Sequence, residues 1–395
     1  MSKILFVNGN LHGHFNPTLP IVTELVNRGN EVWYFSSSVF KEKIEAAGAQ
    51  FINADMENYY STYKPSGNHP FYTLLEYMIK YESALIPELL KKTKDMTFDF
   101  AVCDSILGAG YFVKNIMNLP MICSNTTFVK KHLPVPDRMM EYNLHPQLDE
   151  FYHLLHATCD LYEIPIPSGY EFFSNVGDCN LVYTSAEFNS DANDFDESYH
   201  FVGPSILDRQ EMMDFPWEQI EKKEIIYISL GTINTNFTSF YQLCMKALST
   251  LDYKIVLSVG SKCDIASLGL IPDNFIVCKY APQLELLKQA KAFITHGGFN
   301  SVSEALYYKV PVLVIPMAND QYMVAKRVVE LGCGLTYALN ELDETLLNNA
   351  VKALISKEQF QQAAQKIGSS LSNDLGYQTA VDVIIEFSRG IKHGN

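Results

Sequence analysis

Short apolar runs alternate along the first part of the chain with longer segments in which apolar residues recur at helical spacing. The short runs show little polar alternation, which is typical of strands buried on both faces of a parallel sheet. The predicted strands are Ile4–Val7, Glu31–Ser36, Phe51–Asn53, Phe100–Cys103 and Met121–Ser124. The predicted helices are Pro17–Arg28, Lys41–Ala47, Phe71–Lys94 and Gly108–Asn115. This alternation predicts a doubly wound α/β domain.

The regular pattern stops near Val202-Gly203-Pro204-Ser205 and restarts at Ile225, after a polar stretch. At 395 residues the chain is long for a single core, so we expect two domains. The predicted strands of the second half are Ile225–Leu230, Lys254–Val259, Phe275–Cys278, Phe293–Thr295 and Val310–Pro316; helices are predicted at Phe240–Leu251 and Tyr377–Ser388. We predict a first domain over 1–205, a linker over 206–220, a second domain over 221–376 and a C-terminal helical segment over 377–395.

A glycine-rich turn follows one predicted strand of the second half. His296-Gly297-Gly298 precedes Asn300 and Ser301, which suit the start of a helix. Ligands of open α/β sheets bind at the carboxyl ends of strands, and a helix N-terminus attracts phosphate. Glu304 lies one turn into that helix, where it can accept hydrogen bonds from a ribose. The alternative is an ordinary strand-to-helix turn whose glycines serve geometry alone.

His14 and Asp104 follow two different predicted strands of the first domain. Both side chains should emerge at the same edge of the sheet. A carboxylate that bonds one imidazole nitrogen fixes the tautomer and leaves the other nitrogen to take a proton. The alternatives are a polar turn residue or helix cap for His14, and a structural helix cap for Asp104. The turn around His14 lacks Gly-x-Gly-x-x-Gly, which argues against NAD.

One run in the second half of the chain resembles the motif of a known family. The run FITHGGFNSVSEALYYKVPVLVIPMANDQ, from Phe293 to Gln321, resembles the nucleotide-sugar box of inverting glycosyltransferases that use UDP-sugars to modify small molecules. It is similar in particular to the bacterial macrolide- and flavonoid-modifying enzymes of the YjiC type. Gly13-His14-Phe15-Asn16-Pro17 matches the Gly-His-x-x-Pro catalytic turn of that family. The resemblance implies a GT-B fold, in which two Rossmann-like domains face a central cleft and the C-terminal helix packs back on the first domain.

By this resemblance, His14 is the general base that deprotonates an acceptor hydroxyl, and Asp104 orients it. The resemblance also implies a UDP-sugar site. The phosphate contacts are His296, Gly298, Asn300 and Ser301, and Ser229, Gly231 and Thr232 face the same site. The base and ribose contacts are Tyr280, Ala281, Gln283 and Glu304, and the contacts to the sugar hydroxyls are Asp320 and Gln321. The last pair is associated with glucose donors. Plant relatives carry tryptophan at the place of Tyr280.

Composition narrows the choice of partners. The net charge of −15 argues against a nucleic-acid surface. With no apparent signal peptide or long apolar run, we expect a cytoplasmic protein without membrane insertion, either a monomer or a weak dimer.

Two sequence patterns could suggest a metal site. Asp194-Phe195-Asp196 matches the Asp-x-Asp metal motif but lies in an acidic loop, and His153 and His156 fall in an amphipathic helix. We therefore expect no metal and no cofactor beyond the UDP-sugar, which is a co-substrate.

The expected function is transfer of glucose from a UDP-sugar to a small apolar acceptor such as a flavonoid, another phenol or a macrolide. Residues 53–80 and 130–168 are expected to bind that acceptor. A UDP-sugar epimerase or hydrolase on the same fold is the alternative enzyme. A nucleotide-sugar sensor without turnover is the alternative outside catalysis.

Overall fold

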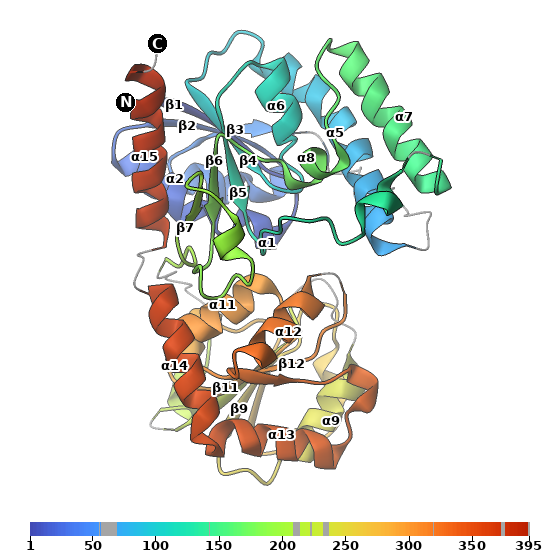
Figure 1. Cartoon of the computed structure of the whole chain (residues 1–395). Helices are drawn as coiled ribbons and strands as arrows, with labels where there is room; N and C mark the ends of the chain where they lie inside the picture. Colours follow the sequence, from blue (N-terminus) through green and yellow to red (C-terminus); the bar gives the residue numbers. More distant parts are fainter. Residues whose placement is uncertain are drawn as a thin grey trace. The chain divides into compact units, whose positions relative to one another are not determined.

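The computed structural model describes residues 1–54, 56, 69–141, 143–207, 214–221, 223–231, 237–318, 320–372 and 376–393. The chain divides into two compact units (Figure 1). The first comprises Met1–Ile206 and Leu375–Asn395, and the second comprises Leu207–Asp374. Each unit is built on one parallel sheet with helices on its faces, so the predicted α/β class with two Rossmann-like domains is confirmed.

The sheet of the first unit has the strand order β3-β2-β1-β4-β5-β6-β7, and neighbouring strands are parallel. Its strands are β1 (Lys3–Val7), β2 (Glu31–Ser36), β3 (Gln50–Asn53), β4 (Phe100–Asp104), β5 (Met121–Asn125), β6 (Cys179–Val182) and β7 (Tyr199–Phe201). The order reverses direction between β1 and β4, and a loop can open outward only at such a switch point. The fold therefore places the residues after β1 and β4 at the position where doubly wound sheets bind ligands.

Helices cover both faces of this sheet. They are α1 (His12–Phe15), α2 (Thr18–Asn27), α3 (Lys41–Ala46), α5 (Pro70–Thr93), α6 (Gly110–Ile116), α7 (Pro146–Leu161), α8 (Gly169–Ser174) and α15 (Tyr377–His393), with 3₁₀ turns η1 (Ser38–Phe40), η2 (Asp137–Met140) and η3 (Ala192–Asp194). The C-terminal helix α15 runs beside α2 (Figure 1). Its buried Ala380, Val381 and Ile384 join the core that contains Ile21 and Leu25 of α2. Burial of this apolar face holds the end of the chain on the first unit.

The second unit has the strand order β10-β9-β8-β11-β12-β13, again with parallel neighbours and a switch point between β8 and β11. Its strands are β8 (Ile225–Ser229), β9 (Lys254–Ser258), β10 (Phe275–Cys278), β11 (Ala290–Thr295), β12 (Val312–Val314) and β13 (Gly334–Thr336). Its helical segments are η4 (Trp217–Gln219), α9 (Thr238–Leu248), η5 (Ile265–Leu268), α10 (Gln283–Leu287), α11 (Phe299–Tyr307), α12 (Gln321–Glu330), η6 (Leu339–Glu341), α13 (Glu344–Ser356) and α14 (Glu358–Ser372).

The structure differs from the sequence-based expectations in a few elements. His14 does not precede a helix in an open turn but lies within α1, a single helical turn ahead of α2. Pro17 then starts α2 with a proline-compatible φ of −63°, which separates the two helices. The acidic loop that contains Asp194 lies between β6 and β7, two paired strands that were not predicted. With 4 and 3 residues, these strands are too short for their periodicity to be recognised.

Candidate active site

The carboxyl ends of β1 and β4 bring His14 and Asp104 together across the switch point of the first sheet. The Nδ1 atom of His14 lies 2.7 Å from Oδ1 of Asp104. The Asp104 side chain is fully buried, and 17% of the His14 side chain is exposed. The two residues are 90 positions apart in sequence. A short contact between an imidazole N–H and a buried carboxylate is a charge-assisted hydrogen bond, the stronger class of such bonds.

The loop after β4 holds the Asp104 carboxylate in place. Its Oδ2 atom accepts hydrogen bonds from the backbone N–H of Leu107 at 2.8 Å and of Ile106 at 3.3 Å. Asp104 thus caps its own loop rather than the helix α6, which begins at Gly110, and its two roles use different oxygens. Backbone donors on Oδ2 leave Oδ1 for the imidazole. The carboxylate therefore has a fixed orientation toward His14.

Thr126 is a third member of this cluster that the sequence interpretation missed. Its Oγ1 atom lies 2.8 Å from Nδ1 of His14, and the residue is buried. Thr126 directly follows β5, the neighbour of β4 in the sheet, so its position relative to a strand end was the available signal. With both oxygens at Nδ1, we place the imidazole proton there. In the neutral ring Nε2 then carries the lone pair that accepts a proton.

In the second unit, His296 lies at the end of β11 between two glycine backbones. A Cβ atom on Gly298 would lie 2.6 Å from Nε2 of His296, and one on Gly231 would lie 2.8 Å from Cε1. Gly231 also has a φ of +83°, which a side chain would oppose. The imidazole therefore fits against the main chain only because both positions are glycine. This packing brings the predicted Gly231, His296 and Gly298 into one cluster.

Burial lowers the pKa of His296 from its usual 6.5 to about 4, so the imidazole is neutral at physiological pH. The hydroxyl of the buried Thr295 lies 3.4 Å from Nδ1 of His296. The donor and acceptor roles in this contact depend on the tautomer of the ring, and the tautomer with its proton on Nε2 is the one that accepts from the hydroxyl. A neutral imidazole in this tautomer can donate a hydrogen bond to an anionic oxygen but adds no net positive charge.

The predicted ribose residues contact one another. Nε2 of Gln283, at the start of α10, donates to Oε2 of Glu304 in α11 at 2.6 Å. The Oε1 atom of Gln283 lies 3.4 Å from the hydroxyl of Tyr227, and its Nε2 lies 3.5 Å from Oγ of Ser301. These contacts fix which end of the Gln283 amide faces Glu304. Two polar side chains from different helices are thus held together at one edge of the sheet.

The Asp320-Gln321 pair begins α12 and lies beside the glycine turn. The Oε1 atom of Gln321 accepts from the backbone N–H of Met317 at 2.9 Å and of Ala318 at 3.2 Å. A Cβ atom on Gly297 would lie 3.3 Å from the backbone oxygen of Gln321, so the two loops are in contact. With its oxygen occupied by backbone donors, the Gln321 side chain presents its NH₂ group as a donor.

The remaining predicted residues flank these clusters, except one. Ser229 ends β8 beside Thr295 of β11, and Asn300 and Ser301 lie in the first turn of α11. Tyr280 and Ala281 precede α10, and 48% of Tyr280 is exposed, so its ring offers an accessible flat surface. Thr232 lies outside the described residues, as do parts of the expected linker and of the acceptor-binding stretch 53–80.

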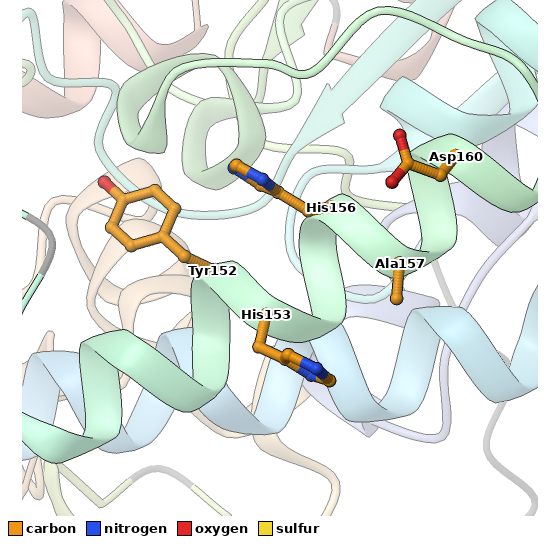
Figure 2. A pocket seen from close by; sticks show the side chains of 5 residues that line it. All are labelled: Tyr152, His153, His156, Ala157 and Asp160. Carbon is orange, nitrogen blue, oxygen red and sulfur yellow. The ribbon is translucent and has the colours of Figure 1, made fainter.

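The histidine pair of α7 does not assemble into a metal centre. Tyr152, His153, His156, Ala157 and Asp160 line a pocket along this helix, and Figure 2 shows His153 pointing to a different side of the helix from His156. Within the described ranges there is no group of three or more His, Cys, Asp or Glu side chains that could hold a metal ion. Asp196 instead accepts hydrogen bonds from its neighbour Ser198.

Known proteins match this chain over nearly its whole length. Residues 242–384 match the C-terminal domain of erythromycin biosynthesis protein CIII-like proteins. The uncharacterized UDP-glucosyltransferase YojK of Bacillus subtilis is 33% identical over 394 residues, which cover 98% of this chain and 97% of YojK. The NDP-glycosyltransferase YjiC of Bacillus subtilis is 28% identical, over 98% and 97% of the two chains. The crystal structure of the kitacinnamycin glycosyltransferase matches with a TM-score of 0.84 and 25% identity, over 97% and 98%.

Two Rossmann-like units with polar clusters at both switch points, together with these structural neighbours, define a glycosyltransferase of the GT-B fold. The chain belongs to the UDP-glycosyltransferase family, and its YjiC and macrolide glycosyltransferase relatives confirm the resemblance read from the sequence motifs. Relatives are named UDP-glucosyltransferases and NDP-glycosyltransferases, so the substrates of the family are a nucleotide sugar and an acceptor. In the described part of the chain, no helix combines the length and the apolar character that a membrane span requires.

Proposed function

We propose that this protein is an inverting glycosyltransferase that transfers glucose from UDP-glucose to a hydroxyl of a small apolar acceptor, such as a flavonoid, another phenol or a macrolide. The observation that carries the proposal is the His14–Asp104 contact of 2.7 Å at the switch point of the first sheet. Sensors and simple binding proteins have no use for a histidine whose tautomer is fixed by a buried carboxylate.

In the proposed reaction, Nε2 of His14 removes the proton of the acceptor hydroxyl. The acceptor oxygen forms a bond to the anomeric carbon from the face opposite UDP, and the bond from that carbon to the UDP oxygen breaks, with its electron pair leaving on UDP. One displacement from the opposite face inverts the configuration. Asp104 stabilises the imidazolium that forms, because its buried carboxylate already bonds Nδ1.

In this proposal, fixed dipoles stabilise the negative charge that develops on UDP, and no metal is required. The N-terminus of α11, around Gly298, Asn300 and Ser301, carries the positive end of the helix dipole, which favours an anionic phosphate. The neutral His296 ring adds its Nε2–H donor. Preorganised donors of this kind stabilise a leaving phosphate without reorganisation cost.

Two pairs of polar residues, Gln283 with Glu304 and Asp320 with Gln321, would bind the nucleoside and the sugar. Gln283 and Glu304 are proposed to bind the ribose, with Tyr280 stacking on the uracil. The carboxylate of Asp320 is an acceptor and the NH₂ group of Gln321 a donor for sugar hydroxyls. The choice of glucose rests on the family resemblance, which associates this pair with glucose donors. The choice of an apolar acceptor follows the names of the family's macrolide-modifying relatives.

The test is transfer from UDP-glucose to a mixed panel of flavonoids and macrolides without added metal, followed by UDP release and glycoside mass. UDP-galactose, UDP-N-acetylglucosamine and dTDP-glucose serve as competing donors. NMR of the product gives the anomeric configuration. We expect a β-glucoside from the wild-type protein and a fall in kcat of roughly 10²- to 10⁴-fold in His14→Ala.

The matched control is His12→Gln, which changes the other histidine of α1. His12 is exposed and packs edge-on against Phe40. Its replacement should leave kcat within about twofold of wild type, since surface changes rarely exceed ~0.5 kcal/mol. Free glucose or an epimer formed without acceptor would favour the hydrolase or epimerase alternative. UDP binding without turnover on any acceptor, unaffected by His14→Ala, would favour a sensor.

A further inference from the structure

A buried glutamate beneath the catalytic loop has no role in the chemistry described so far. Glu82 lies in the middle of α5, and its exposed fraction is 0%. Neither of its carboxylate oxygens has a hydrogen-bond partner among the described residues. On the same helical face, Ile79 and Ile86 are buried in the core of the first unit. An apolar residue would be the ordinary occupant of this position, because burial of an unpaired carboxyl group is costly.

The same helix contains a second buried glutamate that is treated differently. Glu76 lies one and a half turns earlier, and its Oε1 atom is 2.6 Å from Nζ of Lys80. Its Oε2 atom accepts from the side-chain amide of Gln147 at 3.2 Å. The chain therefore supplies a cation and a donor for one buried carboxylate and neither for the other. This contrast argues that Glu82 is held as a neutral acid.

The surroundings of Glu82 belong to the loop that carries Asp104. Its polar neighbours are the Asn175 carboxamide and the Ala109 backbone N–H, although neither contact has good hydrogen-bond geometry, and its charged neighbour is Asp104. Burial, reinforced by the Asp104 charge, raises the pKa of Glu82 well above its usual value. The nearby Cys103 thiol of β4 is neutral as well, because burial raises its pKa also.

The loop after β4 contains a strained residue and is held in place by the Asn175 side chain. Ala109 is not a glycine, yet it adopts a left-handed backbone conformation, with φ of 48°. Such a residue persists only where its surroundings over-determine it. Asn175 ends α8 in the same region, with φ of 44°, as asparagine commonly does at a helix C-terminus. The Asn175 side chain clamps the loop at two points, since its Nδ2 donates to the Ser105 oxygen at 3.0 Å and its Oδ1 accepts from the Tyr111 N–H at 3.0 Å. Glu82 lies against this clamp.

We propose that Glu82 is a positioning residue of the active site, whose neutral carboxyl group supports the Asn175 clamp and thereby fixes Asp104 toward His14. This inference rests on the proposed role of His14 as the base. A neutral acid fits here where a carboxylate would not, because a second negative charge would compete with Asp104 for the same surroundings. The Asp104 carboxylate already contacts two backbone donors and the imidazole.

The test compares Glu82→Gln and Glu82→Leu with the wild-type protein, with Glu88→Leu on the more exposed side of the same helix as the control. The infrared difference spectrum, wild type minus Glu82→Gln, should contain the C=O band of a protonated carboxylic acid at neutral pH. Glu82→Gln should keep kcat and the acid limb of the kcat/KM profile. Glu82→Leu should lower kcat roughly ten- to a hundred-fold without raising KM for UDP-glucose and without lowering the thermal unfolding midpoint.

Several results would overturn the inference. The first is the absence of the protonated-acid band. The second is a shift of the acid limb to lower pH in Glu82→Gln, which would reveal a lost negative charge. An unchanged kcat in Glu82→Leu would also overturn it, as would a lower unfolding midpoint in that variant, which would mark a structural residue. His14→Ala is measured in parallel. If it retains wild-type activity, the proposed function fails; if it is inactive and the Glu82 variants behave like wild type, only the role of Glu82 fails.

Discussion

Replacement of Gly298 by alanine tests the idea that the His296 ring is positioned by the glycines around it. The new Cβ atom would lie 2.6 Å from Nε2 and 2.9 Å from Cε1 of His296, closer than side-chain carbons approach other atoms. The backbone of Gly298 has φ of −59° and ψ of 133°, which alanine adopts without strain. Any effect of the substitution therefore comes from the contact with the ring.

The ring cannot easily retreat, because the Gly231 backbone lies on its other side. Overpacking of this kind typically costs about 1–3 kcal/mol. If UDP needs the ring in its original place, that cost appears in the binding free energy. At 1.4 kcal/mol per tenfold change, we expect the Kd for UDP to rise roughly 5- to 150-fold. UDP alone is the ligand, so the unknown acceptor does not enter the measurement.

Isothermal titration with UDP gives the Kd of the wild-type protein, Gly298→Ala, His296→Ala and the double variant. Gly390→Ala in α15 is the matched control, because a Cβ there meets nothing within 4 Å. The double variant should bind like His296→Ala alone, since the clash disappears with the ring. An unchanged Kd in Gly298→Ala, or an equal loss with and without His296, would refute the reasoning.

Two further predictions concern stability. The pKa of His296 is about 4 in the folded protein and 6.5 when unperturbed, so between these pH values only the unfolded chain binds the proton. The free energy of unfolding therefore falls as the pH is lowered, by up to ~3 kcal/mol. His296→Gln should flatten the plot of thermal unfolding midpoint against pH, and an unchanged slope would contradict this. Lys80→Met should destabilise the protein by about 3 kcal/mol in chemical denaturation, because it leaves the Glu76 carboxylate, 1% exposed, without its cation. Lys41→Met, whose partner Glu45 is 52% exposed, should cost less than about 0.5 kcal/mol, and equal losses would refute the burial argument.

Local pattern was enough to predict the fold class and to place the residues of the proposed donor site near strand ends. Buried parallel strands are continuous apolar runs, and Phe293–Thr295 followed by His296-Gly297-Gly298 is legible from adjacent residues alone. The rule that strand ends of a doubly wound sheet share one edge then placed His14 near Asp104, although 90 positions separate them. These expectations succeeded because they depend on periodicity and on topology, which sequence encodes locally.

Tertiary structure decided which side chains actually meet. Thr126 reaches Nδ1 of His14 across 112 positions; its place directly after β5 indicates the sheet edge but not the contact with His14. Glu82 looks like an ordinary charged helix residue in sequence, yet it is fully buried beneath the loop of Asp104. The reason is physical: burial, desolvation and hydrogen-bond pairing are set by atoms brought together from distant parts of the chain, so the sequence alone specified the sheet edge and the packed core specified the chemistry available there.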